Sequence, residues 1–466
     1  MPYTCDVFVM GAGPGGYPAA IRAAQRGLNV VIAERTAVGG TCLNWGCIPT
    51  KALLKSAQVY NYMKHAEAYG VALDSPARPD FEAMVRRSRG VADQMSKGVQ
   101  FLLKKNNVDV IEGFATLTND RKVSVSKNDD TTEVFEADHI ILATGARSKE
   151  LPHIKQDGEK VIGYRMALTL PKLPETMVVM GSGAIGSEFA HFYSSLGTKV
   201  TIVEFLPNLV PVEDEEISKQ LERSFRKNGI KVMTSSSVES VDTSGEGCLV
   251  TVKDGKGKIT EIQCDIVLSA VGVVTNLEAL NLDALGIAVE RGKVVVDDFY
   301  RTNCPGVYAI GDIVKGPALA HVASHEALVC VEKIAGLDPK PVDYSNIPGC
   351  TYTSPEIASV GLTEKKALEA GYELRIGKFP FTASGKATAS GNRDGMIKLI
   401  FDAKTDEILG CHMIGENVTE MVSGIVIARQ QHVKGSEIIH AVHPHPTLSE
   451  AIMEAAANAY NECVHL

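Results

Sequence analysis

The sequence predicts an α/β fold in which two strand–helix–strand units of one design are nested, one inserted into the domain of the other, with a C-terminal α+β domain after them. The chain has 466 residues, which suggests roughly three domains of about 150 residues each. Residues 6–35 and 177–205 both read as strand, glycine-rich turn, helix, strand and acid. After 339–348 the pattern changes to antiparallel-like strands and helices.

The repeat and a proline-containing segment at 151–174 predict a division into four parts. These are the first part of one domain at 1–147, an inserted domain at 148–272, a return to the first domain at 273–345, and a C-terminal domain at 346–466. Further elements are expected as helices within 51–106 and over 213–228, short alternating segments at 238–263, and strands at 108–114, 121–127, 133–143, 230–234, 265–271 and 307–310.

The charge balance argues against a nucleic-acid-binding protein. The chain carries 47 Lys and Arg against 56 Asp and Glu, a net charge of −9, so the basic surface that such binding needs is missing. No run of about 18 apolar residues suggests a membrane span. The first residues also lack the pattern of a targeting segment, in which a basic stretch is followed by an apolar one. We expect a cytoplasmic protein, or one of an organelle matrix if a transit peptide has been removed.

Each of the two units has the glycine pattern of a Rossmann-like dinucleotide-binding domain. The first glycine permits a tight turn, the second lets a pyrophosphate approach the backbone, and the third lets helix and strand pack closely. The helix N-terminus then offers N–H groups and a positive dipole end to the phosphates. An acid 18 residues after the third glycine is expected to accept hydrogen bonds from ribose hydroxyls. These residues are Gly11, Gly13, Gly16 and Glu34 in the first unit and Gly181, Gly183, Gly186 and Glu204 in the second.

The surroundings of Glu204 predict which dinucleotide the second unit binds. A carboxylate at this position repels a 2′-phosphate, and the stretch 205–209 contains no Arg or Lys to receive one. The second site is therefore expected to bind NAD and not NADP. Because one chain rarely needs two nicotinamides, we expect FAD at the first site.

Two of the ten cysteines, Cys42 and Cys47, lie close together after the first unit, in the string GGTCLNWGCIPTK. Their spacing could close as a disulfide across the first turn of a helix starting near 47, and a thiolate near a helix N-terminus is stabilised for exchange chemistry. Two other interpretations stay open: a zinc site, although no second Cys or His pair lies nearby, and two inert buried thiols. The other eight cysteines are interpreted as isolated buried thiols.

A second cluster with chemical potential is the string HPHPTLSE at 443–450. A dithiol enzyme needs a group that takes a thiol proton and returns it, and histidine titrates near neutrality. A glutamate hydrogen-bonded to the far ring nitrogen would fix the tautomer. Taken alone, the string favours the other interpretation, two loop histidines beside prolines.

Along its whole length, the chain resembles the pyridine nucleotide-disulfide oxidoreductases. The strings that carry the resemblance occur in the family's order: GAGPGGYPAAIRAAQRG, GGTCLNWGCIPTK, ILATGA, GSGAIGSEFA, YAIGD and HPHPTLSEAI. The resemblance implies a C-terminal dimerisation domain and a homodimer in which each active site is shared across the two-fold interface.

Residue roles follow from the same resemblance. Cys42 matches the thiol that exchanges with substrate, Cys47 the thiol beside the flavin, and His445 with Glu450 the base and its partner. Lys51 matches a lysine near the flavin, and Glu188, within the second glycine pattern, its carboxylate partner, although either could be a plain surface charge. The remaining matched positions are Thr41, Ala115, Thr144, Gly145, Asp312 and Ala320 for FAD, and Val238 and Gly272 for NAD.

The function implied is FAD- and disulfide-dependent oxidation of protein-bound dihydrolipoamide with reduction of NAD+, on the lipoyl domain of an acyltransferase or a glycine-cleavage carrier. Sister families fit less well. Glutathione and trypanothione reductases use NADPH, whereas mercuric and large thioredoxin reductases need a C-terminal cysteine pair, and here Cys463 stands alone. A soluble transhydrogenase typically lacks the first cysteine. A non-enzymatic FAD-bound component would not need both cysteines, Lys51 and the His445–Glu450 pair together.

Overall fold

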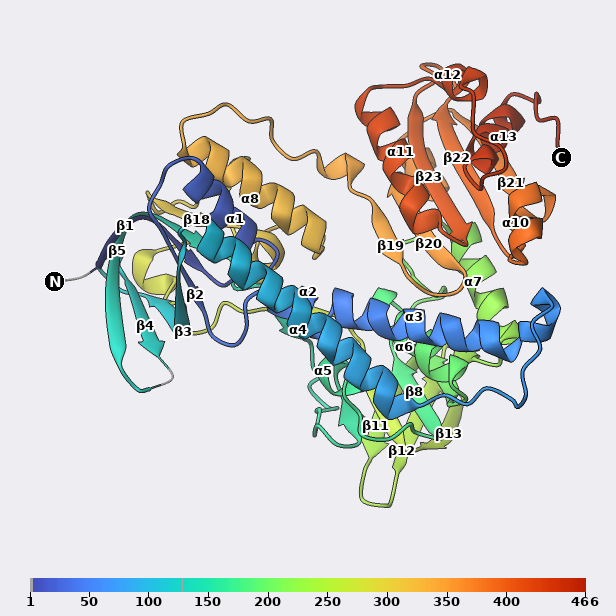
Figure 1. Ribbon diagram of the computed structural model, residues 1–466, viewed down its shortest axis with the longest axis horizontal. Helices are drawn as coiled ribbons and strands as arrows, with labels where there is room; N and C mark the ends of the chain where they lie inside the picture. The colour runs from blue at the N-terminus through green and yellow to red at the C-terminus, as the bar shows by residue number, and fades with distance from the viewer. Residues whose placement is uncertain (1–2, 128) are drawn as a thin grey trace. The chain divides into compact units, whose positions relative to one another are not determined.

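A computed structural model describes residues 3–127 and 129–466. They form two compact units, each of which draws on three separate segments of the chain (Figure 1). The first unit takes its residues from Met1–Leu53, Glu82–Lys149 and Val273–Val342, and the second from Leu54–Phe81, Glu150–Gly272 and Asp343–Leu466.

The first unit is built on a six-stranded sheet. Five strands run parallel in the order β18-β5-β1-β2-β3, and β4 pairs antiparallel with both β3 and β5. The strands are β1 Tyr3–Met10, β2 Val30–Glu34, β3 Asp109–Leu117, β4 Val123–Lys127, β5 Thr132–Leu142 and β18 Val307–Ala309. Two small antiparallel pairs accompany it, β6 Ala146–Ser148 with β15 Val273–Thr275 and β16 Val289–Glu290 with β17 Lys293–Val294.

Alternation along β1 divides the core of this unit between the two faces of the sheet. Val7 and Val9 join one cluster of buried residues, and Phe8 and Met10 join another, because successive side chains of a strand point to opposite faces. The first cluster includes residues of helices α1, α4 and α8. The helical elements are α1 Gly16–Gln25, α2 Gly40–Trp45, α3 Cys47–Lys64, α4 Phe81–Lys105, η2 Asp283–Leu285, η3 Gly311–Ile313 and α8 Ala320–Ile334, and the chain changes unit within α3 and at the start of α4.

The second unit contains a five-stranded parallel sheet in the order β10-β9-β8-β14-β7. A three-stranded antiparallel sheet, β11-β12-β13, belongs to the same part of the chain. The strands are β7 Val161–Ile162, β8 Thr176–Met180, β9 Lys199–Val203, β10 Lys231–Met233, β11 Ser236–Asp242, β12 Cys248–Asp254, β13 Ile259–Cys264 and β14 Ile266–Ser269. The helices are η1 Ala66–Tyr69, α5 Tyr164–Ala167, α6 Ala184–Ser195 and α7 Glu215–Lys227.

The rest of the second unit is an α+β arrangement around a five-stranded antiparallel sheet, β19-β20-β23-β22-β21. Its buried cluster draws on the sheet and on helices α11, α12 and α13. The strands are β19 Gly349–Thr351, β20 Glu356–Gly361, β21 Leu374–Pro380, β22 Met396–Asp402 and β23 Ile408–Gly415. The helices are η4 Tyr344–Asn346, α9 Glu364–Glu369, η5 Phe381–Ala383, α10 Gly385–Ser390, α11 Val418–Gln430, α12 Gly435–His440 and α13 Glu450–Ala459.

The two βαβ units and the C-terminal α+β part agree with the predicted fold class. Strands and helices occur where the sequence predicted them, with ends that differ by a few residues. The segment 51–106 is not one helical run, because α3 ends at Lys64 and α4 begins at Phe81. The sequence also gave no sign of β7, a two-residue strand in the proline-containing segment that joins the parallel sheet beside β14.

The interpretation of eight cysteines as isolated buried thiols is wrong in two respects. Cys248 and Cys264 are directly opposite each other on neighbouring strands, a pairing that depends on strand register and not on sequence spacing. Three more cysteines are only half-buried, namely Cys304, Cys350 and Cys463. Among the helices of the described chain, none is both long and apolar enough to span a bilayer.

Candidate active site

The first glycine turn has the backbone geometry that a dinucleotide needs. Gly11 has a φ of +101°, and a Cβ there would lie 2.5 Å from the carbonyl oxygen of Ala143. A Cβ on Gly16 would lie 1.8 Å from the oxygen of Gly11, so helix and turn are in close contact. A Cβ on Gly13 would have no heavy atom nearer than the Cα of Gly40, at 3.9 Å. This open backbone beside the start of α1 fits a pyrophosphate.

The second turn repeats this geometry in the other unit. Gly181 has a φ of +91°, with its Cβ position 2.6 Å from the oxygen of Ala270. The Cβ position of Gly186 is 2.1 Å from the oxygen of Gly181, and Gly183 has nothing within 4 Å. The two turns therefore offer the same kind of site at the starts of α1 and α6.

The acids at the ends of β2 and β9 are held by matching hydrogen bonds. Glu34 Oε2 accepts from the N–H of Ala12 at 2.9 Å, and Glu34 Oε1 accepts from the N–H of Thr36 at 2.9 Å. Glu204 Oε2 accepts from the N–H of Ser182 and Oε1 from that of Leu206, at 2.7 and 2.8 Å. A carboxylate has about four lone-pair positions, so each acid keeps acceptor capacity for ribose hydroxyls.

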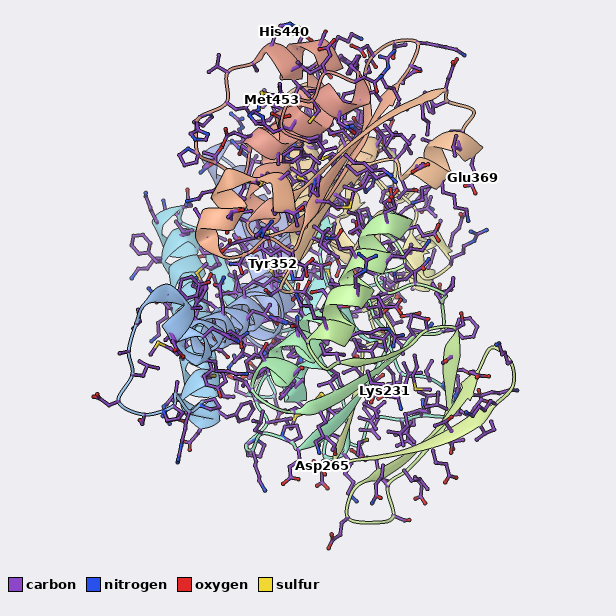
Figure 2. The ribbon with its side chains drawn as sticks, turned by 90° about the vertical axis from the view of Figure 1, so that its right-hand side faces the viewer. Lys231, Asp265, Tyr352, Glu369, His440 and Met453 are labelled. Carbon is purple, nitrogen blue, oxygen red and sulfur yellow. The ribbon has the colours of Figure 1, made fainter. Side chains whose placement is uncertain are left out.

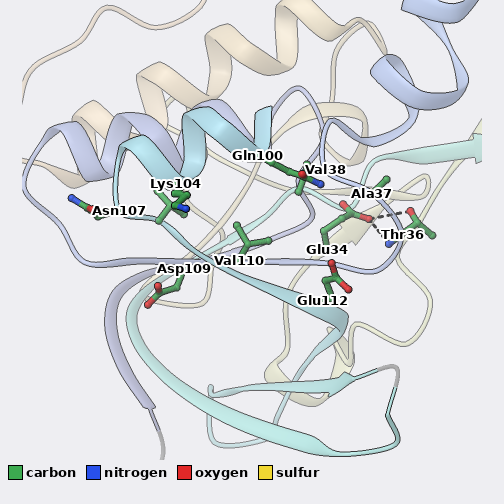
Figure 3. Close-up of a pocket in the computed structure, with 11 residues that line it drawn as sticks. Glu34, Thr36, Ala37, Val38, Gln100, Lys104, Asn107, Asp109, Val110 and Glu112 are labelled. Atoms are coloured by element: carbon green, nitrogen blue, oxygen red, sulfur yellow. Dashed lines mark hydrogen bonds between the residues drawn. The ribbon is translucent and has the colours of Figure 1, made fainter. Parts of the chain in front are cut away.

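A cavity of about 630 Å³ opens at Glu34 in the first unit (Figure 3). Figure 3 shows the Glu34 carboxylate hydrogen-bonded to Thr36 at one side of the hollow, with Lys104 across from it. The position at the end of β2 is where the ribose end of a dinucleotide is expected. The lining residues are Glu34, Thr36, Ala37, Val38, Gln100, Lys104, Asn107, Val108, Asp109, Val110 and Glu112.

Cys42 and Cys47 lie on consecutive helices and face each other. Cys42 is in α2, and α3 begins with Cys47, in agreement with the predicted helix start. The Cys42 thiol is hydrogen-bonded to Cys47, and this bond together with burial raises the pKa of Cys42, while the nearby Lys51 opposes the shift. Cys47 is thus the partner suited to carry the negative charge, at the N-terminus of α3 where the helix dipole favours an anion.

The bend between the two helices is tightly constrained. At Gly46 a Cβ would come within 3.1 Å of the Thr41 oxygen, which leaves little room for a larger residue. The Thr50 hydroxyl donates to the Gly46 oxygen at 2.7 Å. The buried Asn44 amide donates to the oxygens of Val38 and Gly40, both at 3.0 Å. These contacts constrain the backbone between the two cysteines.

The other residues matched to FAD lie in the first unit. The Thr144 hydroxyl donates to the Asn276 oxygen at 2.7 Å, and the Asn276 N–H donates to the oxygen of Gly145 at 2.9 Å. Asp312 follows Gly311 in η3, and burial raises the pKa of Asp312 although the charge of Lys293 opposes it. Thr41 lies in α2, Lys51 in α3, Ala115 in β3, and Ala320 at the start of α8.

Two residues that bind the backbone beside the residues matched to FAD were not identified from the sequence. Asn276 binds the backbone on both sides of the Thr144–Gly145 bond. Glu326, only 1% exposed, accepts from the N–H of Gly311 at 2.6 Å. Neither belongs to a recognisable motif. Asn276 lies 132 residues from Thr144 and Glu326 lies 15 residues from Gly311, and neither spacing follows a known pattern.

Glu188, matched as the partner of Lys51, and the residues matched to NAD, Val238 and Gly272, all lie in the second unit with the second glycine turn. Glu188, in α6, is 3% exposed, and its Oε1 accepts from the N–H of Tyr352 at 2.9 Å (Tyr352 is labelled in Figure 2). Val238 is buried in β11, and Gly272 has a φ of +108° at the end of this segment. Glu188 is therefore not a plain surface charge.

His445 and Glu450 form the pair expected from the resemblance. His445 Nδ1 lies 2.8 Å from Glu450 Oε1, and the other carboxylate oxygen accepts from the N–H of Thr447 at 2.7 Å. Burial alone would raise the pKa of Glu450, but the bonds from Thr447 and His445 outweigh it and lower the pKa. A carboxylate at Nδ1 leaves Nε2 of the exposed His445 ring available to a substrate thiol.

A second histidine–carboxylate pair lies one turn further along α13. Glu454 is 3% exposed, and its oxygens contact Cys463 Sγ at 2.9 Å and His465 Nδ1 at 2.5 Å. No motif in the sequence points to this pair. Glu450 and Glu454 lie one turn apart on the same face of α13. Cys463 and His465 follow the helix, and they reach Glu454 only because the chain folds back along α13.

Comparison with known proteins shows the family. Residues 5–327 match the family described as pyridine nucleotide-disulphide oxidoreductase, and residues 347–456 match its dimerisation domain. A protein named dihydrolipoyl dehydrogenase from Rhizobium etli is 46% identical over all of both chains. A protein of the same name from Zymomonas mobilis is 46% identical over 99% of each chain.

Solved structures agree with these sequence matches. LpdA from Mycobacterium tuberculosis superposes with a TM-score of 0.90 at 28% identity, covering 97% of this chain and 99% of that one. The HOCl-induced flavoprotein disulfide reductase RclA from Escherichia coli, as its Cu(II) complex, has a TM-score of 0.88 at 25% identity, covering 98% and 99%. The family consists of oxidoreductases, and its dihydrolipoyl dehydrogenases use FAD and NAD. This chain belongs to the pyridine nucleotide-disulphide oxidoreductase family.

Proposed function

We propose that this protein oxidises protein-bound dihydrolipoamide to lipoamide and reduces NAD+ to NADH. The observation that carries the proposal is the Cys42–Cys47 pair, in which the Cys42 thiol in α2 is hydrogen-bonded to Cys47 at the start of α3. Full-length relatives at 40–46% identity bear the name dihydrolipoyl dehydrogenase. FAD, when bound, supplies the two-electron relay between the thiols and NAD+.

The protein's own residues supply thiol exchange and proton transfer. His445 takes the proton of a substrate thiol, and Glu450 holds the ring through Nδ1 and stabilises the imidazolium. The substrate thiolate attacks the sulfur of Cys42 in the oxidised pair and displaces Cys47. The second substrate thiol then attacks the mixed disulfide, forms the lipoamide disulfide, and releases Cys42 as a thiol.

The choice of NAD over NADP rests on Glu204. Its carboxylate is 6% exposed and bound to the backbone of Ser182 and Leu206, so it stays where a 2′-phosphate would have to be placed. The stretch 205–209 brings no cation to that position. Replacement of Glu204 by Ala together with arginines added in this stretch is expected to relax the preference, and unchanged discrimination would place the specificity elsewhere.

We propose a homodimer as the working assembly, with each active site shared between two copies. The matched dimerisation domain supports the dimer. The substrate's carrier is proposed to be the lipoyl domain of a 2-oxoacid dehydrogenase acyltransferase or of a glycine-cleavage protein. The proposed location is the cytoplasm or an organelle matrix, and the Pisum sativum relative, 41% identical, is named as mitochondrial.

The decisive experiment is an anaerobic titration of the FAD-loaded protein with dihydrolipoamide, followed by NAD+, monitored by visible absorbance. A long-wavelength absorbance after the dithiol and NADH after NAD+ are expected. The Cys47→Ser variant should lose both signals while keeping its flavin. A flavin that NADH reduces but dihydrolipoamide does not would reject the proposed substrate and point to another disulfide or a metal ion, as in mercuric reductases.

A further inference from the structure

A second pair of thiols lies in the antiparallel sheet β11-β12-β13, which the proposed reaction does not use. We propose that Cys248 and Cys264 are a reversible oxidation site, at which a small peroxide converts the two thiols into an intrachain disulfide. The site belongs to the second unit, whereas Cys42 and Cys47 belong to the first.

Strand register places the two cysteines opposite each other. Cys248 begins β12, Cys264 ends β13, and the two are cross-strand partners. Opposite residues of an antiparallel pair have Cβ atoms about 4.5–5.5 Å apart on one face of the sheet, and a disulfide needs about 3.5–4.5 Å. A small closing movement of the two strand ends is therefore enough to join the sulfurs.

The two thiols are already in contact and chemically unequal. A hydrogen bond from Cys264 lowers the pKa of Cys248, and the charge of Lys160 acts in the same direction, whereas burial and the carboxylates of Asp157 and Asp265 oppose it. The same thiol–thiol bond, with burial, raises the pKa of Cys264. Cys248 is thus the better nucleophile, and Cys264 the thiol that resolves its oxidised form.

The reaction balances with hydrogen peroxide as the oxidant. The Cys248 thiolate attacks one peroxide oxygen, so that an S–O bond forms, the O–O bond breaks, and hydroxide leaves as water after taking a proton. The sulfur of Cys264 then attacks the sulfenic acid on Cys248, forms the S–S bond, and releases the second water. Two thiols are oxidised by two electrons and one peroxide is reduced to two waters.

Burial selects the oxidant. Cys248 is 1% and Cys264 3% exposed, within a cluster of buried residues, so a protein or a large disulfide cannot reach them. The strand ends approach closely here, since a Cβ on Gly247 would lie 2.5 Å from the Cys264 oxygen. A molecule the size of peroxide needs only local opening of the first β12–β13 pair.

The cross-link should also tighten the sheet. Asp265, labelled in Figure 2, follows Cys264 directly. Its carboxylate accepts the N–H groups of Glu175 and Thr176 at 2.8 and 2.9 Å, which ties this point of the chain to β8. A disulfide next to this anchor closes a loop in the unfolded chain, so the oxidised protein is expected to melt at a higher temperature.

The test is peptide mapping of the FAD-loaded full-length protein treated with hydrogen peroxide. After thiol blocking in denaturant, trypsin places the two cysteines on separate peptides, 232–253 and 259–291, because Lys253 and Lys258 lie between them. We expect a linked peptide pair that disappears when the sample is reduced before blocking. Cys264→Ser should abolish the link, whereas Cys411→Ser, which removes another buried cysteine, should retain it.

The opposite result is equally clear. If Cys248 and Cys264 are both still fully blocked after treatment with a large molar excess of hydrogen peroxide, the proposed site does not exist. A rise in melting temperature that persists in Cys264→Ser would likewise overturn it. Neither measurement depends on dihydrolipoamide activity, so the test of this site is independent of the proposed function.

Discussion

At the residue scale, the exposed His445 ring is held by a hydrogen bond at Nδ1. Its Nδ1 binds Glu450 at 2.8 Å, while its neighbour His443 binds the oxygen of Ala441 at 2.9 Å through the same ring atom. Two histidines two residues apart thus have different partners, a carboxylate and a backbone carbonyl. Only the carboxylate stabilises an imidazolium by charge, and this difference separates the expected base from a loop histidine.

Replacing His445 by Ala should slow reduction of the protein by dihydrolipoamide about 10²–10⁴-fold, the usual contribution of a general acid–base group. His443→Ala is the matched control and should stay within about threefold, because it leaves the His445–Glu450 pair intact. Stopped-flow absorbance measures the dithiol half-reaction, and NADH-driven flavin reduction should be unchanged in both variants. An equal loss of rate in the two variants would show that His445 is not the general base.

Glu213 predicts a pH dependence of stability. Burial, and to a lesser extent Asp214, raises the pKa of Glu213 to about 7 against the lowering effects of Ser359 and Lys366. A folded-state pKa above the unfolded value favours folding only while the group is protonated. The free energy of unfolding should therefore fall by about 3 kcal/mol in all as the pH rises from below 4.5 to above 7.

The Glu213→Gln variant tests this, because an amide cannot ionise. Its melting temperature should exceed that of the parent at pH 8, and the difference should vanish near pH 4. Glu215→Gln is the control, since Glu215 is exposed and paired with Lys219 at 2.7 Å on the same helix. A difference that is independent of pH would show that Glu213 does not titrate in this range.

At the element scale, the N-terminus of α7 is held by a buried lysine of β22. Lys398 is 1% exposed, and its Nζ lies 2.9, 2.6 and 2.6 Å from carboxylate oxygens of Asp214, Glu216 and Glu364. Burial would lower the pKa of Lys398, but these three bonds raise it. One cation therefore joins helices α7 and α9 to the C-terminal sheet.

Removing this cation should be strongly destabilising. Lys398→Met leaves three carboxylates without their shared partner, which is expected to cost about 3–5 kcal/mol in the free energy of unfolding. Lys404→Met, which removes an exposed ion pair of 3.8 Å with Glu373, should cost at most about 1 kcal/mol. Denaturant unfolding of both variants gives the comparison, and similar values would show that burial of Lys398 has little consequence.

Two glycines of the turn before α6 are expected to have different roles, one in NAD+ binding and the other in stability. Gly183 has open space at its Cβ position, whereas that of Gly186 lies 2.1 Å from the Gly181 oxygen. Gly183→Ala should keep the melting temperature but weaken NAD+ binding by at least about tenfold, because the methyl group occupies the expected pyrophosphate space. Gly186→Ala should lower the melting temperature as well. NAD+ titration combined with thermal melts checks both, and unchanged affinity in Gly183→Ala would place the pyrophosphate elsewhere.

At the scale of the whole molecule, the proposed shared active site predicts complementation between two inactive variants. In a mixed dimer of Cys47→Ser and His445→Ala chains, one site combines both substitutions and the other combines Cys47 with His445. Random reassortment makes half of the dimers mixed, so about a quarter of the parental activity should return. If both residues of a site came from one chain, mixing the variants would restore nothing.

The sequence by itself was enough for the fold class and the chemistry of the local motifs. The glycine–acid pattern recurs at Glu34 and Glu204, and a pattern that repeats along the chain is visible without a structure. Cys42, Cys47 and the strings around them are also local, because backbone rules act on neighbouring residues. The family matches agree with that part of the interpretation.

Only the tertiary structure decided which residues of different elements meet. The contacts of Glu326 with Gly311, Lys398 with Asp214, and Cys248 with Cys264 depend on strand register and helix packing. Register is set by burial of a whole strand face, and a buried charge is stable only where packing brings its partners. These are properties of the assembled core, so no spacing in the sequence could reveal them.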